Sequence, residues 1–600
     1  MRTLLSLLLA VSLMPVGCAD EGAMDDTGSL TLGLRDSVSG WFHVKIYETA
    51  PTKGNMNPEV VFETGCIDAK SQTYELNNIP SGSELVVEIA SFGSAECSLE
   101  SRAEVGYRGL VDIPKGEDAP YYHVPLFQQG ASTAFPEDIN ISASIAEPIE
   151  FCDSDSQCAE FSDRHVCYDG QSPKYWCVPA CAEDSDCSSY HPGATCDTAT
   201  SWCTLSSPYP LNLSSPRAMG HAATLKDGSV AFLGGFGSKF NGRMIAAKQA
   251  VEVFDVATGL FHKKELTGLD GWAAAMSGMA KLPDGRIVLV GGVRSAELGY
   301  KVAGNGAVSI TASDLAAKDC TSDPCLPNIR NELVVLDIEK GKATVSQLPI
   351  PVAASTVLSL GQGKILVAGG LAPSFGGLGG DTNDENLATD RVWIVQVASD
   401  SSITAEEVGT MTVPRVGAAA LCQNSACDSV LILGGNREGS VAEVMSTEGD
   451  AAIFVPVKID GLPGTLANPT ICGGALVAGQ GISPMTLEPV DGNWTAEMLE
   501  NGDFDLTQLS ATATSASGDC WVVGGLAAGG PTGLAFRVSG GAVAPKQYEA
   551  SRARFGAMAA PIGSGLLEGG LLFGGGVELG EPDGDTGSLE WVRGAEIILP

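Results

Sequence analysis

Short apolar stretches that end in glycine recur along the C-terminal two-thirds of the chain. Each contains three or four apolar residues, and all but one end in Gly-Gly. A short apolar run bounded by turn residues is typical of a buried strand. The dipeptides Asp227-Gly228 and Asp284-Gly285 precede the first two runs and favour tight hairpins. The pattern predicts an all-β region of small antiparallel sheets, with the seven stretches at 230–235, 287–292, 365–370, 431–435, 475–479, 521–525 and 571–575.

The N-terminal part shows a different pattern, in which apolar and polar residues alternate. Leu30, Leu32 and Leu34 alternate with polar or small residues, and the stretch 42–46 does the same. Alternation of this kind predicts half-buried strands, so residues 29–128 are expected to form a small antiparallel β-sandwich. The stretch 76–82, LNNIPSG, resembles a strand-to-turn segment of prealbumin-like or carboxypeptidase-regulatory-like sandwich modules. Residues 129–150 are polar and interrupted by proline, and we expect a linker there.

The repeated phrase resembles the kelch repeat. The shared features are the diglycine after the second strand, Pro-Arg before the first strand at 216–217 and 414–415, and the turn Asp255-x-x-Thr258-Gly259. Arg552 is the expected counterpart without proline. The resemblance implies that residues 205–600 form a kelch-type β-propeller of seven four-stranded blades, with six and eight as alternatives. Most fourth-strand tryptophans of the family are missing, and Trp494 is the best candidate.

The chain ends directly after what would be the third strand of the last blade. A propeller without its final strand would leave a sheet edge exposed. We therefore expect Pro210–Leu213, just before the first blade, to supply the missing strand and close the ring.

Cysteine spacing divides the remaining sequence. Eight cysteines lie within 151–204, and their gaps of 5, 8 and 9 residues and then 5, 8 and 6 residues indicate two copies of one four-cysteine module. Zinc sites would require CxxC pairs, which are absent there, so disulfides are expected, with their connectivity open. Elsewhere the spacing predicts local pairs and one pair between neighbouring blades. The candidates are Cys152, Cys158, Cys167, Cys177, Cys181, Cys187, Cys196 and Cys203 in the modules, and the pairs Cys66–Cys97, Cys320–Cys325, Cys422–Cys427 and Cys472–Cys520.

Residues 1–18 have the pattern of an export signal: Arg2, an apolar stretch too short for a mature transmembrane helix, and small residues. The segment ends at Val16-Gly17-Cys18, which resembles the lipobox of bacterial lipoproteins, although Pro15 stands where that family usually has leucine. The resemblance implies acylation of Cys18, with ordinary signal cleavage as the alternative. Of 17 cysteines, 16 remain after Cys18. Residues 19–28 would then be a flexible tether, and Ala19 resembles a signal for the outer membrane of Gram-negative bacteria.

Charge excludes one class of partner. The net charge of −37 repels phosphate backbones, so nucleic acid is not expected, and contact with the membrane would rest on the lipid anchor alone. Clustered carboxylates offer oxygen ligands for calcium, with Asp381, Asp384 and Glu385 as candidates and a solvated loop as the alternative. No other cofactor is expected.

The residues predict no catalytic machinery. Propeller oxidases of the galactose oxidase type hold copper with histidine and tyrosine, whereas residues 205–600 contain only His221 and His262, both near the first blade. No Gly-x-Ser-x-Gly elbow marks a nucleophile. The predicted function is therefore binding or scaffolding through the long loops 294–330 and 371–391, with envelope proteins, extracellular proteins or polysaccharide as partners and the oligomeric state left open. A carbohydrate-active or oxidase-like enzyme is the alternative, and a deep axial pocket lined by acids and aromatics would favour it.

Overall fold

A computed structural model describes residues 27–135 with short gaps, separate strands between 147 and 205, and residues 212–600 with gaps, the longest of which are 314–317, 320–325 and 373–387. The described residues are all-β, apart from a three-residue 3-10 turn at Leu99–Ser101. No helix in this part of the chain is long and apolar enough to cross a membrane. The lipidation candidate Cys18, Cys320 and Cys325, and Asp381, Asp384 and Glu385 lie outside the described residues.

Two sheets enclose the core of the N-terminal region. One has the order β5–β1–β8, and the other has the order β3–β2–β6–β7–β9, with β4 also paired to β2. Buried leucine, isoleucine, valine and phenylalanine side chains from both sheets form one cluster, as the apolar alternation in the sequence requires. The strands are β1 (Thr27–Leu34), β2 (Trp41–Tyr47), β3 (Val60–Glu63), β4 (Ile67–Asp68), β5 (Thr73–Pro80), β6 (Gly82–Phe92), β7 (Arg102–Ile113), β8 (Tyr121–Val124) and β9 (Phe127–Gln128).

Seven sheets follow, and we call them repeat sheets 1 to 7. Each is built on four antiparallel strands, which follow chain order except for the outer strand of sheet 7, and each of the seven apolar stretches forms the second strand. Sheets 1 to 4 are β16 (His221–Thr224), β17 (Val230–Leu233), β20 (Val251–Asp255) and β21 (Leu260–Lys263); β22 (Gly278–Lys281), β23 (Ile287–Val290), β28 (Glu332–Asp337) and β29 (Lys342–Gln347); β30 (Thr356–Gly361), β31 (Lys364–Ala368), β32 (Arg391–Val397) and β33 (Ile403–Thr410); and β34 (Ala419–Cys422), β35 (Ser429–Leu433), β36 (Ala442–Glu448) and β37 (Ala451–Val457).

The last three repeat sheets carry small additions. A short parallel strand, β38 (Ile459–Asp460), extends sheet 5, and β49 (Tyr548–Glu549) extends sheet 6. Sheets 5 to 7 are β39 (Thr470–Cys472), β40 (Ala475–Ala478), β41 (Met485–Val490) and β42 (Asn493–Met498); β43 (Ala511–Thr514), β44 (Cys520–Val523), β47 (Leu534–Ser539) and β48 (Ala542–Val543); and β50 (Met558–Pro561), β51 (Leu571–Gly574), β54 (Ala595–Ile598) and β10 (Ser132–Ala134).

Backbone hydrogen bonds link the repeat sheets in a closed cycle. In six sheets the second glycine of the pair after the second strand, and in sheet 5 the single glycine Gly479, donates its N–H to a carbonyl oxygen just before the first strand of the next sheet. The seventh sheet donates to the first, so the cycle has no free end. The bonds run from Gly235 to Ala274, Gly292 to Val352, Gly370 to Arg415, Gly435 to Leu466, Gly479 to Thr507, Gly525 to Arg554 and Gly576 to Arg217, with lengths of 2.6 to 3.0 Å.

The first glycine of each pair is required because the same carbonyl approaches it closely. A Cβ on Gly575, which has a φ of +66°, would lie 1.9 Å from the Arg217 oxygen, whereas a Cβ on Gly584, with a φ of +64°, would meet nothing within 4 Å. We expect Gly584→Ala to cost about 1 kcal/mol, from its left-handed backbone alone. Gly575→Ala should cost clearly more, because it also pushes sheets 7 and 1 apart. Chemical unfolding of both variants measures the difference, and equal losses would contradict this role of the glycine.

The closing strand is not the expected one. The prediction that Pro210–Leu213 completes sheet 7 is wrong: β10, from the segment expected to be a linker, pairs antiparallel with β54. Asn212 lies nearby, and its Oδ1 accepts a hydrogen bond from the Ala595 N–H at 2.8 Å. The edge of β54 is therefore covered by residues about 460 positions earlier in the chain. A side-chain contact adds to the strand pairing, because the Ser132 hydroxyl donates to the Glu596 carboxylate at 2.9 Å.

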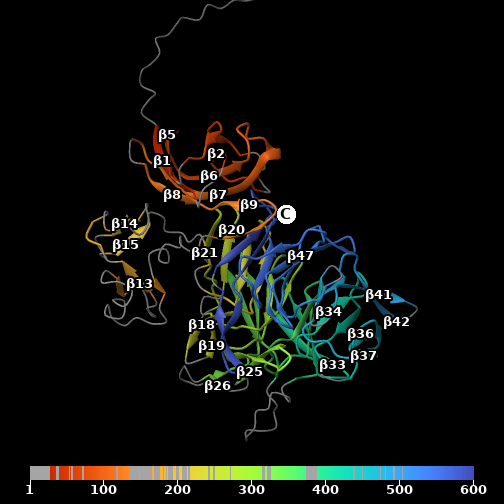
Figure 1. The fold of residues 1–600 in the computed structure, drawn as a ribbon. Helices are drawn as coiled ribbons and strands as arrows, with labels where there is room; N and C mark the ends of the chain where they lie inside the picture. The colour runs from red at the N-terminus through yellow and green to blue at the C-terminus, as the bar shows by residue number, and fades with distance from the viewer. Residues whose placement is uncertain are drawn as a thin grey trace, which may run out of the picture.

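The N-terminal sheets pack against one end of the cycle, beside sheets 1 and 7 (Figure 1). Tyr107 donates its hydroxyl to the Val256 oxygen at 2.7 Å, and the Gly109 N–H donates to the Thr258 oxygen at 2.7 Å. Phe135, just after β10, stacks edge-on against Phe261 of sheet 1, with ring centroids 5.2 Å apart. A single buried cluster thus spans both parts of the molecule, and burial of this apolar surface stabilises their contact.

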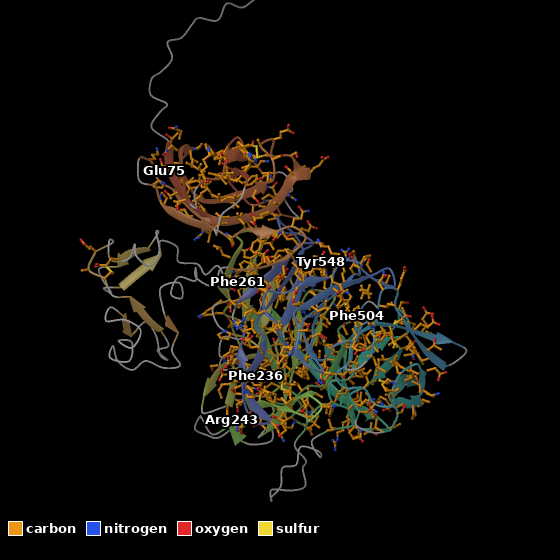
Figure 2. All side chains as sticks on the ribbon, viewed as in Figure 1. Glu75, Phe236, Arg243, Phe261, Phe504 and Tyr548 are labelled. Carbon is orange, nitrogen blue, oxygen red and sulfur yellow. A yellow bond between two sulfur atoms is a disulfide. The ribbon has the colours of Figure 1, made fainter. Side chains whose placement is uncertain are left out.

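A further sheet lies at the opposite end, and we call it the cross-sheet. It is built from the connections between second and third strands of sheets 1, 2 and 7. Figure 2 places Phe236 and Arg243 at this end and Phe261 near the N-terminal sheets. The Tyr300 hydroxyl donates to the Gly580 oxygen at 2.7 Å and so joins sheets 2 and 7. The strands of the cross-sheet are β18 (Phe236–Phe240), β19 (Arg243–Ala246), β24 (Ser295–Val302), β25 (Val308–Ser313), β52 (Val577–Asp583) and β53 (Thr586–Trp591). Two small hairpins form separate two-stranded sheets. They are β26 (Lys318–Asp319) with β27 (Leu326–Pro327), and β45 (Leu526–Ala527) with β46 (Gly530–Pro531).

Disulfides join three of the pairs that the spacing predicts, Cys66–Cys97, Cys422–Cys427 and Cys472–Cys520. In the cysteine-rich region the structure adds Cys181–Cys196, the first and third cysteines of the second module. The described strands there are β11 (Glu147–Pro148), β12 (His165–Cys167), β13 (Trp176–Pro179), β14 (Ala194–Asp197) and β15 (Trp202–Leu205). Cys152, Cys158 and Cys187 lie outside the described residues, as do the side chains of Cys167, Cys177 and Cys203.

Candidate functional site

The first strands of all seven repeat sheets surround one central cavity of about 410 Å³. Every sheet contributes one lining residue with a positive φ just before its first strand. These are Met219, Met276, Ala354, Gly417, Asn468, Leu509 and Gly556, with φ between +44° and +63°. Residues in this conformation are costly unless the surroundings hold them. Here they are held by backbone bonds around the cavity: for example, the Met276 N–H donates to the Met219 oxygen at 2.8 Å.

Side chains without charge line this cavity. Small residues, methionines and hydroxyl groups dominate, and among the described residues the lining contains no aspartate, glutamate, lysine, arginine, phenylalanine, tyrosine or tryptophan. Met219, Met276 and Leu509 also pack against the buried cluster beneath the cross-sheet. The cavity and the cross-sheet are therefore parts of one structure at the same end of the cycle.

His221 is the one titratable group among the described residues that line the cavity. Its Nε2 lies 2.7 Å from the Ser277 oxygen, and because a carbonyl can only accept, Nε2 carries the proton. Burial lowers the pKa of His221, against the opposing effect of the Ser277 carbonyl, so the imidazole is neutral at pH 7. A neutral His221 ties sheet 1 to sheet 2 across the cavity wall.

This burial predicts a pH dependence of stability. The pKa of His221 lies below its ordinary 6.5 in the folded chain, so the unfolded chain binds more protons as the pH falls through 6.5, and stability is lost on the acid side. His221→Gln, whose amide can donate the same hydrogen bond, should lose less stability between about pH 7 and pH 5 than the native chain. Urea unfolding of both chains over this range measures the difference, and identical pH slopes would show that His221 is not buried as described.

The donor set does not fit the copper ion of galactose oxidase-type propellers, which is held by histidine and tyrosine. One histidine and no tyrosine lines the cavity. His262 lies on β21, the outer strand of sheet 1, away from the lining. Among the described residues, no three His, Cys, Asp or Glu side chains gather where they could hold a metal ion.

Buried ion pairs behind the cavity were not expected from the sequence. In sheets 1, 4 and 7 an arginine just before the first strand meets a glutamate on the third strand. The pairs are Arg217–Glu252, Arg415–Glu443 and Arg554–Glu596, with both side chains almost or fully buried. The expected counterpart in sheet 7, Arg552, is wrong by two residues: it pairs instead with Glu578 and is half-exposed. In sheets 1, 4 and 7 the paired arginine lies two residues before the positive-φ residue. This spacing was the signal that could have identified Arg554 instead of Arg552.

The two segments expected as recognition loops are placed differently. Residues 294–330 are no open loop, because they hold β24 and β25 of the cross-sheet as well as β26 and β27. In the segment 371–391, Leu371 forms backbone bridges to both Ala353 and Ala388. The calcium candidates Asp381, Asp384 and Glu385 lie outside the described residues. Trp494, the candidate for a fourth-strand tryptophan, lies buried on β42, the fourth strand of sheet 5.

Comparison with known proteins gives one kind of match. No protein-family model and no curated protein matches the chain. Among solved structures, the chain is similar to one described as a "Novel fungal alcohol oxidase with catalytic diversity among the AA5 family, in complex with copper". The similarity has a TM-score of 0.41 and 16% sequence identity, and it covers 64% of this chain and 75% of that one.

Proposed function

We propose that this protein is an exported binding or scaffolding module, and that its repeat sheets are the blades of a seven-bladed kelch-type β-propeller. The cycle of seven glycine-to-carbonyl bonds supports this architecture, since each sheet contacts the next and the last contacts the first. Closure of this kind leaves no sheet end to template aggregation. A rigid ring can then present a recognition surface on the segments that protrude from it.

The observation that carries the binding function is the contrast between the cavity and the cross-sheet. A propeller enzyme acting on sugars would place acids and aromatics at the axis, and the part of the axial lining that the structure describes holds neither. Connections from sheets 1, 2 and 7 instead merge into a continuous sheet over this end. Exposed side chains lie on it, among them Glu297, Lys301 and Ser309. This surface is the proposed site for envelope proteins, extracellular proteins or polysaccharide.

Lipid anchoring at Cys18 is part of the proposal. Its support is the sequence Val16-Gly17-Cys18 after an export signal. Disulfides such as Cys66–Cys97 and Cys181–Cys196 fit an oxidising compartment outside the cytoplasm. We propose the cell envelope of a Gram-negative bacterium, with the outer membrane as the anchoring site. Mass spectrometry of the mature N-terminus tests this: an acylated Cys18 is expected, and an unmodified N-terminus elsewhere would overturn it.

Affinity capture from the native envelope, with glycan binding in parallel, tests the recognition surface. The triple variant Glu297→Ala, Lys301→Ala, Ser309→Ala changes the cross-sheet without touching its core. The matched control is Lys458→Ala with Asp460→Ala, an exposed ion pair beside sheet 5. The proposal predicts that the cross-sheet variant loses the captured partner or glycan and that the control retains it. As a further step, residues 373–387 are replaced by a glycine-serine linker in both variants. If the cross-sheet variant and the control then still capture the partner or glycan equally, the proposal is contradicted.

A further inference from the structure

Repeat sheet 5 is the most weakly bonded member of the cycle. Around the cavity, the backbone N–H of each positive-φ residue donates to the carbonyl of its counterpart in the preceding sheet at five of the seven junctions. The two exceptions are the amides of Asn468 and Leu509, which form no such bond in the described chain. These are the junctions on either side of sheet 5, between sheets 4 and 5 and between sheets 5 and 6.

The internal pairing of sheet 5 is also reduced. Its first strand, β39, has three residues and a register shift between Thr470 and Ile471. Its second and third strands pair at two positions, whereas those of sheet 1 pair at four. Ala478 stands where the other sheets have the first glycine of the pair after the second strand. Fewer ladder bonds and a missing glycine make sheet 5 the part of the cycle that opens at the lowest free energy.

A disulfide joins sheet 5 to sheet 6, at one of the two junctions that lack the axial backbone bond. Cys472 ends β39, Cys520 begins β44 of sheet 6, and the bond joins them with Cα atoms 5.7 Å apart. The other direct links at this junction include two backbone hydrogen bonds, from the Gly479 N–H to the Thr507 oxygen at 3.0 Å and from the Val543 N–H to the Glu500 oxygen at 2.9 Å. The side-chain bond from Asn468 to Gln508 is longer, at 3.4 Å. Both cysteines line a surface pocket of about 240 Å³, although their side chains are only 6% and 1% exposed. The bond therefore lies at the floor of a surface pocket, and the proposal requires a thiol to reach it through that pocket.

We propose that Cys472–Cys520 is a redox-controlled latch that holds sheet 5 in the cycle. A dithiol reductant, small or carried by a protein, attacks one sulfur through its thiolate and forms a mixed disulfide. Its second thiol then displaces that sulfur, so the reductant leaves as a disulfide and Cys472 and Cys520 each gain a proton. Sheet 5 loosens from sheet 6 once the bond is gone, because the axial backbone bond that five of the seven junctions have is missing there and fewer backbone bonds remain to hold the two sheets together. The inference is independent of the partner bound at the cross-sheet.

Hydrogen exchange read by mass spectrometry tests the latch on the full mature chain. The chain is compared before and after treatment with dithiothreitol, and alkylation of the thiols follows the reduction. We expect Cys472 and Cys520 to be alkylated while the protein remains folded. Exchange across residues 470–498 should then rise at least about tenfold, whereas residues 287–290 of sheet 2 should stay protected.

Two double variants separate this disulfide from the others. Cys472→Ser with Cys520→Ser should show the fast exchange in sheet 5 without reductant. Cys422→Ser with Cys427→Ser, which removes the staple within one hairpin of sheet 4, should not. If the first variant fails to fold, the reduced native chain still gives the answer. Resistance of Cys472 and Cys520 to reduction in the folded chain, unchanged exchange in sheet 5, or an equal rise in all seven sheets would each overturn the proposal.

Discussion

Substitution of Thr133 by proline is expected to open the cycle of repeat sheets. The Phe135 N–H donates to the Ala595 oxygen, and the Leu599 N–H donates to the Ala131 oxygen. In an antiparallel ladder such pairs alternate, so Thr133 and Ile597, which lie opposite each other, form the hydrogen-bonded pair between them. Proline removes this donor at the centre of β10, and the Ile597 oxygen left without its partner should cost about 1–3 kcal/mol.

The loss should be accompanied by self-association, because the edge of β54 becomes available to a second chain. Thr133→Ser is the control, since it retains the hydroxyl that accepts a bond from the Gln128 N–H at 3.0 Å. Chemical unfolding and light scattering of both variants give the result. A proline variant that is monomeric and as stable as the serine variant would show that β10 does not close the cycle.

Removal of one partner from a buried ion pair is the second large effect. Arg415 and Glu443 are both fully buried and 2.8 Å apart, and burial lowers the pKa of Arg415 while the carboxylate opposes that shift. Glu443→Leu leaves the guanidinium charge without its counter-ion in the interior and should cost about 3–5 kcal/mol. Adding Arg415→Met removes that charge as well, so the double variant should lose less than the single one.

An exposed pair provides the comparison. Arg391 and Glu407 are 3.2 Å apart, and both side chains are well exposed, so Glu407→Leu should change stability by less than about 1 kcal/mol. Urea unfolding of the four chains measures these differences. Equal losses from Glu443→Leu and Glu407→Leu would contradict a buried, charged Arg415.

The apolar pattern was sufficient to locate the repeat sheets. All seven glycine-terminated stretches are second strands, because a short buried run and a turn signal are properties of a few neighbouring residues. The Cys472–Cys520 pair was also accessible from its position beside two consecutive hairpins. Local chemistry therefore carried most of the information about the strands and their order.

Features that depend on distant partners were not accessible in the same way. The closing strand Ser132–Ala134 has three small residues and no apolar pattern, and only the edge of β54 selects it. The cross-sheet arises because connections from sheets 1, 2 and 7 meet in space, although each alone looks like a loop. The glutamates that bury Arg217, Arg415 and Arg554 lie 28 to 42 residues away, so the arginine positions gave no sign of their partners.

The most direct test of the closed cycle is a nuclear Overhauser effect between the methyl groups of Thr133 and Ile597 in a methyl-labelled mature chain. Residues directly opposite in an antiparallel pair have Cβ atoms about 5 Å apart, so a clear cross-peak is expected between these two. Contacts from Ile597 to methyl groups near Leu213 instead, with none to Thr133, would contradict closure by the N-terminal segment and the architecture built on it.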